Sequence, residues 1–341
     1  MTFDTLPTAA AAGFHMPAEW EDHERCWMAW PCRAATWGDN LDATRRNFAA
    51  VANAVGEFEP VTMLARPGDA ALARSLCSGK VSILAADLDD SWTRDIGPNF
   101  VRNDAGEIAA ALFHFNAWGQ KYATWRKDAA IGHRIAEFLG IRTFSSPLFM
   151  EGGGINVDGE GTLLTTGQCV LNDNRNPGLT RAEAEQALRD LLGVSRILWM
   201  PGDPDDTETD GHVDGIACFV APGKVLVEIC PAEGTERYDN MQANLAAVQG
   251  VTDAENRKLD IVLIEEAHEA QRRNDIFSCS YINFYIANGG IVMPGYDIDR
   301  DADARRIVAG LFPDRQVVQL SISDIALGGG GIHCITQQQP R

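Results

Sequence analysis

The strongest constraint on the fold of this chain is a pattern of short segments that recurs roughly every sixty residues. In each copy, a polar or glycine-bearing stretch leads into a short β-rich run, then a turn signal and a second β-rich run. The turn signals NDAG, VDGEG, APGK and ANGG each predict a hairpin. The copies start at Ser91, Met150, Asp210, Cys279 and Gly328. We expect the run of the last copy to pair with the segment ERCWMAWPC near the N-terminus.

Stretches with helical periodicity separate the hairpins. In segments such as TWRKDAAIGHRIAEFLG, TRAEAEQALRDLLG and RYDNMQANLAAVQG, apolar residues recur at three and four positions, and each segment stops at glycine. Another apolar run follows each helix, for example SRILWMP and LDIVLIE. The unit is therefore hairpin, helix, strand. About five copies predict a closed ring of α/β modules, because a ring hides sheet edges. An ordinary α/β sandwich with coincidental spacing is the alternative.

Length and composition predict one domain. The chain has 341 residues, 45% of them hydrophobic, and no linker or shift in composition divides it, so we expect a single domain over residues 1–341. The first 15 residues lack the basic and apolar regions of a secretory signal, and no stretch approaches about 18 uninterrupted apolar residues. These features predict no leader, no membrane span and a cytoplasmic location.

Charge and cysteine content limit the partners. The formal net charge of -19 argues against binding to nucleic acid, whose phosphates require a basic surface, and it favours a cationic ligand. The eight cysteines are scattered, and none forms a CxxC pair. We therefore expect mostly free, buried thiols of a reducing compartment and no zinc framework.

Ionisable residues occur at the same point of four of the five copies, just where the hairpin begins. They are Asp95 in WTRDIGP, Glu151 in MEGGG, His212 and Asp214 in DGHVDG, and Cys334 in GIHC. In a ring with pseudo-symmetry, equivalent positions converge on the axis. The sequence therefore predicts one pocket that holds a thiol, an imidazole and three carboxylates.

Carboxylates around a thiol indicate a cationic substrate. The thiolate is the nucleophilic form, and nearby negative charges raise the pKa of the thiol, which does not suit attack on a neutral carbonyl compound. A guanidinium group, in contrast, pairs with carboxylates through a rigid fork of N–H donors. We expect Asp95 and Asp214 to hold such a group with its carbon open to Cys334, while His212 relays protons.

Each of these residues also has a plainer interpretation. Asp95 follows an arginine and could be half of a structural ion pair, and Glu151 could cap a turn. Together with Asp210, His212 and Asp214 form a D-x-H-x-D cluster that is typical of a metal-dependent hydrolase. A non-catalytic propeller that binds polyamines is a further alternative.

Several other residues are expected near the substrate. Trp92 lies in the same stretch as Asp95, and Trp118 in FNAWGQKYATW could line a slot for an alkyl chain. Gly330 and Gly331 leave bare backbone, which lets a flat guanidinium approach the thiol. The acidic run PGDPDDTETD could receive a second positive charge on the substrate.

The residues next to Cys334 are expected to form a strand. The run from Ile332 to Thr336 alternates like one. Because neighbours in a strand face opposite sides, His333 is expected to point away from Cys334 and to take no part in the site.

The chain resembles the agmatine deiminase family of the guanidine-modifying pentein superfamily. The matching stretches are MPAEWEDHERCWMAWP at 16–31, DDSWTRDIGP at 89–98, FNAWGQKY at 115–122, MEGGGINVDGEGTLLTT at 150–166, ETDGHVDG at 208–215 and GGGGIHCITQQQP at 328–340. One departure is Gly331, where the family pattern leads us to expect asparagine. The family includes bacterial peptidylarginine deiminases, so peptidyl or free arginine is the alternative substrate.

The resemblance implies a five-bladed α/β propeller that hydrolyses agmatine to N-carbamoylputrescine and ammonia, without a metal or organic cofactor. It implies that Cys334 is the nucleophile, His212 the general acid and base, and Glu151 the partner of His212. It also implies that Asp95 and Asp214 clamp the guanidinium. A homodimer is the default expectation, because closed twofold dimers are the commonest assemblies.

Overall fold

Over residues 7–341, the chain forms an α/β fold with five separate β-sheets, two of four strands and three of three strands. The computed structural model describes residues 7–341. The prediction that the N-terminus carries no leader concerns residues 1–6 in part, and these lie outside the described residues. The predicted α/β class is confirmed.

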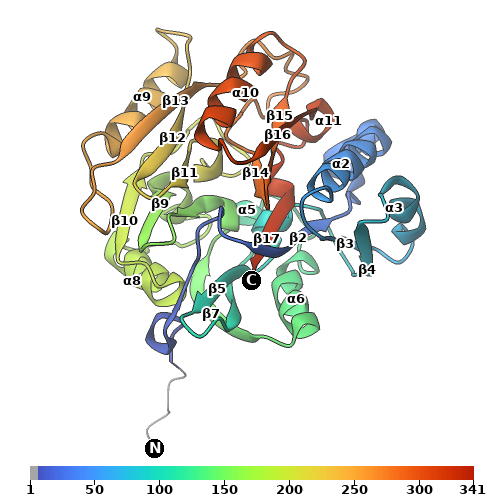
Figure 1. Cartoon of the computed structure of the whole chain (residues 1–341), viewed down its shortest axis with the longest axis horizontal. Coiled ribbons are helices and arrows are strands. Elements are labelled where there is room, and N and C mark those ends of the chain that lie inside the picture. Colours follow the sequence, from blue (N-terminus) through green and yellow to red (C-terminus); the bar gives the residue numbers. More distant parts are fainter. Residues whose placement is uncertain (1–6) are drawn as a thin grey trace, which may run out of the picture.

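The hairpins occur where the turn signals predict them, and each is antiparallel. They are β5 (Asn99–Asn103) with β6 (Ile108–His114), β8 (Ile155–Val157) with β9 (Thr162–Thr166), β11 (Ala217–Ala221) with β12 (Lys224–Ile229), and β14 (Tyr285–Ala287) with β15 (Gly290–Gly295). The fifth pair joins the two ends of the chain, because β17 (Thr336–Pro340) runs antiparallel to β2 (His23–Ala29). Figure 1 shows these red and blue strands side by side. The expected pairing with ERCWMAWPC is confirmed.

Each sheet gains a third strand after a helical crossover, and this strand is parallel to the second strand of the hairpin. The helices and strands are α6 (Ile131–Leu139) and β7 (Arg142–Phe149), α8 (Arg181–Leu192) and β10 (Arg196–Met200), α9 (Glu236–Val248) and β13 (Asp260–Glu265), α10 (Arg300–Leu311) and β16 (Gln316–Ser321), and α2 (Leu41–Val55) and β3 (Val61–Ala65). Figure 1 shows these helices at the periphery of the view. Two short strands extend the four-stranded sheets, β1 (Phe14–His15) on β5 and β4 (Val81–Ala85) on β3. The repeat of hairpin, helix and strand is therefore a structural unit.

Helix α8 shows how the local sequence sets the bounds of an element. Thr180 caps its N-terminus, and the side chain of Glu183 reaches back to complete a capping box. Its buried residues are Ala184, Leu188, Leu191 and Leu192, at the spacing of one helical face. The helix ends at Gly193, whose φ of 67° is in the left-handed region.

A short helical turn precedes the first strand of four of the five sheets. These turns are α4 (Thr93–Ile96), η4 (Gly152–Gly154), η5 (Val213–Gly215) and η6 (His333–Ile335). The expectation of a strand from Ile332 was therefore wrong, because His333, Cys334 and Ile335 form a 3-10 turn and the strand begins at Thr336. In such a turn, neighbouring side chains do not alternate between two opposite faces.

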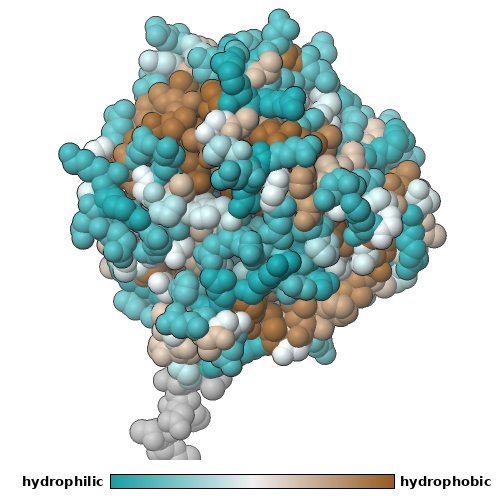
Figure 2. Space-filling view, viewed as in Figure 1, coloured by the Kyte–Doolittle hydropathy of each residue, from teal (hydrophilic) through white to brown (hydrophobic). Residues whose placement is uncertain are grey.

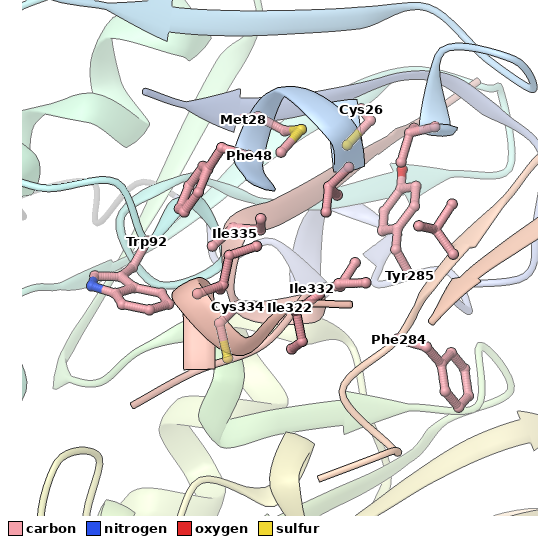
Figure 3. Close-up of a cluster of buried hydrophobic side chains, with 14 of the residues drawn as sticks. Cys26, Met28, Phe48, Trp92, Phe284, Tyr285, Ile322, Ile332, Cys334 and Ile335 are labelled. Carbon is pink, nitrogen blue, oxygen red and sulfur yellow. The ribbon is translucent and has the colours of Figure 1, made fainter. Parts of the chain in front are cut away.

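The largest hydrophobic cluster surrounds β2 and α2 and includes Cys334. Figure 3 shows the sulfur of Cys334 at the edge of this cluster, pointing away from Ile335 and Phe48. All eight cysteines are free and all but Cys77 are buried, which confirms the expectation of free thiols. On the face shown in Figure 2, hydrophilic residues cover most of the surface. Among the described residues, no helix combines the length and the apolar character that a bilayer crossing requires.

Candidate active site

Every copy of the repeat places one polar residue two to four residues before its first strand. These residues are Asp95, Glu151, Asp214, Asn283 and Cys334. The prediction counted ionisable residues only, so it missed the asparagine of the fourth copy. His212, Asp214, Asn283 and Cys334 line one cavity, and Asp95 lines an adjoining cavity that also includes Cys334. The structure therefore brings the predicted thiol, imidazole, Asp95 and Asp214 together around adjoining cavities, whereas Glu151 lines neither cavity and contacts His212 instead.

The Cys334 thiol lies between an amide and a carboxylate. The Asn283 Nδ2 atom is 3.2 Å from Sγ, and the backbone N–H of Cys334 donates to Asn283 Oδ1 at 3.2 Å. Asp214 Oδ2 lies 3.6 Å from the sulfur. Burial, together with the charges of Asp214 and Asp95, raises the pKa of the Cys334 thiol well above its usual range. These surroundings therefore favour the protonated thiol, and an added positive charge would favour the thiolate.

The imidazole of His212 pairs with Glu151, whose position depends on a buried arginine. His212 Nε2 lies 3.1 Å from Glu151 Oε2, and Arg175 Nε donates to both carboxylate oxygens at 3.0 and 2.9 Å. Burial lowers the pKa of His212, but the charge of Asp95 and the hydrogen bond to Glu151 raise it well above its usual value overall. This shift favours the imidazolium form of His212. The expected pair of His212 and Glu151 is present, whereas Arg175, in NDNRNPG, had been missed.

Asp95 is held from two sides. Its Oδ2 accepts a hydrogen bond from Trp118 Nε1 at 2.9 Å, and its Oδ1 accepts one from the backbone N–H of Gly153 at 3.0 Å. Burial raises the pKa of Asp95, the charge of His212 lowers it, and the charge of Glu151 raises it further. The resulting pKa is about 6. A bound cation would favour the ionised form, so the carboxyl is suited to hold a positive group.

Trp92 and Trp118 line the cavity next to Asp95 together with Tyr122, which makes one wall aromatic. The hydroxyl of Tyr122 donates to Glu208 at 2.7 Å. Trp118 therefore lines a cavity, as expected, and its indole N–H also holds Asp95. That this cavity takes an alkyl chain stays a prediction.

Glycine is required at Gly153 by close approach. A Cβ atom there would lie 2.5 Å from His212 Nδ1, 3.0 Å from Asp95 Oδ1 and 3.1 Å from Asp214 Oδ2. Only a bare backbone lets these three side chains converge.

The two glycines singled out near the thiol have different surroundings. Gly330 lines the cavity, and a Cβ on it would lie 3.1 Å from the sulfur of Cys334. Gly331 packs under Asn283 instead, where a Cβ would lie 2.6 Å from Oδ1. An asparagine at position 331 would therefore have to displace Asn283.

His333 is not a bystander, and that prediction was wrong. Its Nδ1 lies 2.9 Å from Asp214 Oδ2, because the 3-10 turn directs the imidazole toward η5. Asp214 therefore has His333 on one side and Cys334 on the other.

The residues of the D-x-H-x-D cluster have separate partners. Asp210 pairs with Lys121 and Arg175, His212 pairs with Glu151, and Asp214 pairs with His333. Within residues 7–341, the side chains close enough together to hold a metal are instead Glu151, Cys169 and His212. Arg175 already occupies both oxygens of Glu151, and its charge would repel a cation there. These contacts do not fit a metal centre.

Acidic residues dominate the rest of the cavity lining. The acidic run of the sequence contributes Asp203, Asp205, Asp206 and Glu208, and later segments contribute Glu266 and Asp275. Two arginines also line it, Arg237 and Arg272. Arg237 is paired with Asp203 and Glu266. The lining therefore keeps an excess of negative charge.

Known proteins resemble this chain over nearly its whole length. A family model for Porphyromonas-type peptidyl-arginine deiminase matches residues 15–340. The agmatine deiminase of Pseudomonas aeruginosa (strain LESB58) is 42% identical over 98% of this chain and 97% of that protein. A solved structure of the agmatine deiminase of Enterococcus faecalis matches with a TM-score of 0.95 and 33% identity, and covers 99% of this chain and 98% of that chain.

A more distant structure, DDAH from Pseudomonas aeruginosa, matches with a TM-score of 0.52 and 12% identity over 93% of this chain and 99% of that chain. At that identity the match shows the fold alone. The resemblance seen in the sequence is confirmed, and the chain belongs to the family of agmatine deiminases and Porphyromonas-type peptidyl-arginine deiminases.

Proposed function

We propose that this protein is an agmatine deiminase, which hydrolyses agmatine to N-carbamoylputrescine and ammonia. The observation that carries the proposal is that the Cys334 thiol shares a buried site with an imidazolium and with Asp95 and Asp214. Such a site disfavours a free thiolate and favours a cation, so a guanidinium substrate supplies the charge that the thiolate needs. Relatives named agmatine deiminase, 40 to 44% identical over nearly the whole chain, support the same substrate.

In the first half of the reaction, Asp95 and Asp214 hold the guanidinium by its N–H groups and keep it protonated. The bound cation favours the thiolate, so the Cys334 thiol releases its proton to solvent, and the sulfur forms a bond to the guanidinium carbon while one C–N π bond opens. The tetrahedral adduct then collapses with cleavage of one C–N bond, and His212 gives its proton to the departing ammonia. An amidino-thioether on Cys334 remains.

In the second half, His212 takes a proton from water, and the oxygen adds to the same carbon. The C–S bond then breaks, which returns the thiolate, and the added hydroxyl group loses its proton to solvent to give the neutral ureido product. Glu151, held by Arg175, orients His212 for both transfers, and Asn283 Nδ2 is placed to stabilise the thiolate at 3.2 Å.

The acidic lining supports agmatine over arginine, because the ammonium at the end of agmatine suits the carboxylates of the cavity. One observation favours arginine instead. Arg272 lines the cavity in an exposed segment and could pair with a substrate carboxylate.

Ammonia release from agmatine, free arginine and a peptidyl-arginine substrate tests the proposal, with Cys334→Ser as the inactive control. We expect agmatine to have the highest kcat/KM, and Arg272→Gln to leave that value intact or raise it. A preference for arginine that Arg272→Gln abolishes would overturn the choice of substrate. Acid quenching during agmatine turnover should also reveal an amidino adduct on Cys334 by mass spectrometry, and its absence would contradict the covalent route.

The proposal extends to the assembly of the fold. We place the five modules around a common axis as a five-bladed propeller that forms one domain, since all five sheets share one connectivity and each contributes a residue at the site. We also expect activity without a metal or organic cofactor. Full activity after dialysis against EDTA would agree with this, and recovery only with Mn²⁺ would contradict it.

A further inference from the structure

A chain of buried charged groups continues behind Asp214, on the side away from the cavity. His333 Nδ1 lies 2.9 Å from Asp214 Oδ2, and His333 Nε2 lies 2.9 and 3.1 Å from the two carboxylate oxygens of Glu19. Arg94 follows, with its NH1 atom 3.5 Å from Glu19 Oε1. All four residues are buried. The chain links Asp214 to the segment before β2, which is more than half of the sequence away.

We propose that His333, held by Glu19, is a positioning residue that fixes the carboxylate of Asp214 for the guanidinium group of the substrate. The role assigned to Asp214 rests on the proposed function, whereas the contacts do not.

The geometry requires His333 to be charged. Both ring nitrogens face carboxylate oxygens, and only an imidazolium donates hydrogen bonds from both nitrogens. The groups that face the ring are Asp214 from η5 and Glu19 from the segment before β2. Arg94 from α4 lies nearby and donates to the backbone oxygen of His333. Burial and the charge of Arg94 lower the pKa of His333, but Glu19 and Asp214 raise it above its usual value overall.

The imidazolium has two effects on Asp214. Burial alone would raise the pKa of this carboxyl, but the hydrogen bond and charge of His333 bring it below its usual value, so the carboxylate stays ionised. The contacts to His333 Nδ1 and to the sulfur of Cys334 both involve Oδ2. His333 therefore holds the same carboxylate oxygen that lies beside the sulfur of Cys334.

A purely structural ion pair is the competing explanation, and the chain offers a matched control for it. His23 and Glu59 form another buried pair, with Nδ1 of His23 3.2 Å from Oε2 of Glu59. This pair lies beside Tyr285, and neither residue lines the cavity that contains Cys334. His23 Nε2 also lies 3.0 Å from the backbone oxygen of Glu19, so the pair contacts the main chain of Glu19 but neither its carboxylate nor Asp214. Removing the charge of Glu59 therefore disturbs a similar buried pair while the hydrogen bonds of His333 to Glu19 and Asp214 stay in place.

The test compares the rates at which Cys334 is alkylated by 2-chloroacetamidine, which carries an amidinium charge, and by neutral iodoacetamide. The ratio of the two rates reports recognition of the cation by Asp214 and needs no turnover. The variants are His333→Gln, His333→Asn, Glu19→Gln and Glu59→Gln in the full chain. Asparagine at position 333 places an N–H donor near the position of Nδ1, whereas glutamine leaves Asp214 without that donor.

We expect the ratio to fall about tenfold or more in His333→Gln, because a charge-assisted hydrogen bond is lost. We expect partial recovery in His333→Asn, a smaller fall in Glu19→Gln and no change in Glu59→Gln. A wild-type ratio in His333→Gln, or equal falls in both histidine variants, would overturn the proposal. If His333→Gln does not fold, the comparison of Glu19→Gln with Glu59→Gln decides. Equal ratios of the two alkylation rates in these two variants would mean that the substitutions affect only the stability of the fold, and would overturn the proposal.

Failure of the proposed function would be seen separately. If the wild-type protein labels efficiently with the amidine but releases no ammonia from agmatine, the assignment of the substrate is wrong. The ratio across the variants still decides the role of His333.

Discussion

Cys26 and Cys334 are two buried thiols of the same hydrophobic cluster, but they differ in what surrounds them (Figure 3). Burial raises the pKa of both thiols, and carboxylates add to the effect, Glu59 at Cys26 and Asp214 at Cys334. Cys26 is sealed within β2, whereas Cys334 lines a cavity. A buried thiol beside a carboxylate is therefore not a nucleophile by itself. The difference is access for a cation.

The largest expected effect separates the two thiols directly. Cys334→Ser should lower agmatine turnover by at least about 10³-fold, because a hydroxyl is a much weaker nucleophile than a thiolate. Cys26→Ser should leave turnover per folded molecule nearly unchanged while lowering the free energy of unfolding by about 1–3 kcal/mol, since it buries a hydroxyl. Ammonia release and urea unfolding measure the two quantities. Equal losses of turnover in both variants would remove the distinction.

The carboxylates next to the two thiols give the second comparison. Asp214→Asn should lower kcat/KM for agmatine by about 10²-fold or more, because a buried charge-assisted pair is broken and His333 loses its partner. Glu59→Gln should lower the free energy of unfolding by about 3 kcal/mol and keep kcat/KM near that of the wild type. Steady-state kinetics on samples checked for folding decide the matter. A comparable kinetic loss in Glu59→Gln would show that stability, not substrate binding, underlies both effects.

The carboxylates near the two thiols also differ in the residues that hold them. Glu59, beside Cys26, accepts from Tyr285 and from the backbone N–H of Asn288, whereas Glu151 in the site is neutralised by Arg175. Arg175→Gln should lower kcat by about ten- to a hundredfold with a smaller change in KM, because Glu151 loses its orientation toward His212. Arg175→Lys, which keeps the charge, should have a kcat between those of the wild type and Arg175→Gln. An increase in KM alone would assign Arg175 to substrate binding instead.

The smallest expected effect is a loss of kcat/KM at acidic pH, which the reactivity of Cys334 should share and that of Cys26 should not. The pKa of Asp95 is raised to about 6, so the carboxyl takes up a proton as the pH falls through about 6 and loses its pairing with the guanidinium. We expect kcat/KM to fall about tenfold per pH unit below that value. Asp95→Asn should remove this loss at acidic pH, at a lower overall activity. Labelling of Cys334 by 2-chloroacetamidine should show the same loss, while Cys26 remains unlabelled in the folded protein.

Much of the fold could be predicted because its signals are local. A hairpin such as β11 and β12 depends on a few turn residues, and a helix such as α8 depends on one cap and one apolar face. The 3-10 turn at His333 was missed, because the apolar and polar residues around Cys334 alternate as they do in a strand. Alternation alone does not distinguish a short turn from the first residues of the strand that follows it.

The positions of the site were predictable, but their partners were not. The repeat indicated where Asp95, Glu151, Asp214 and Cys334 would lie, and the same rule extended to uncharged polar residues would have found Asn283. No comparable signal marks Arg175 in the loop after β9, or His333 and Glu19 at opposite ends of the chain.

The sequence by itself determined the repeating unit, the five entry points of the hairpins and the chemistry of a thiol among carboxylates, because each depends on neighbouring residues or on the period of the repeat. Only the tertiary structure decided which carboxylates line the cavities, as Asp95 and Asp214 do, and which is neutralised by a buried cation, as Glu151 is by Arg175. These contacts join residues up to 314 positions apart, such as Glu19 and His333. The contact between Glu19 and His333 depends on the pairing of β2 with β17, which brings the two ends of the chain together.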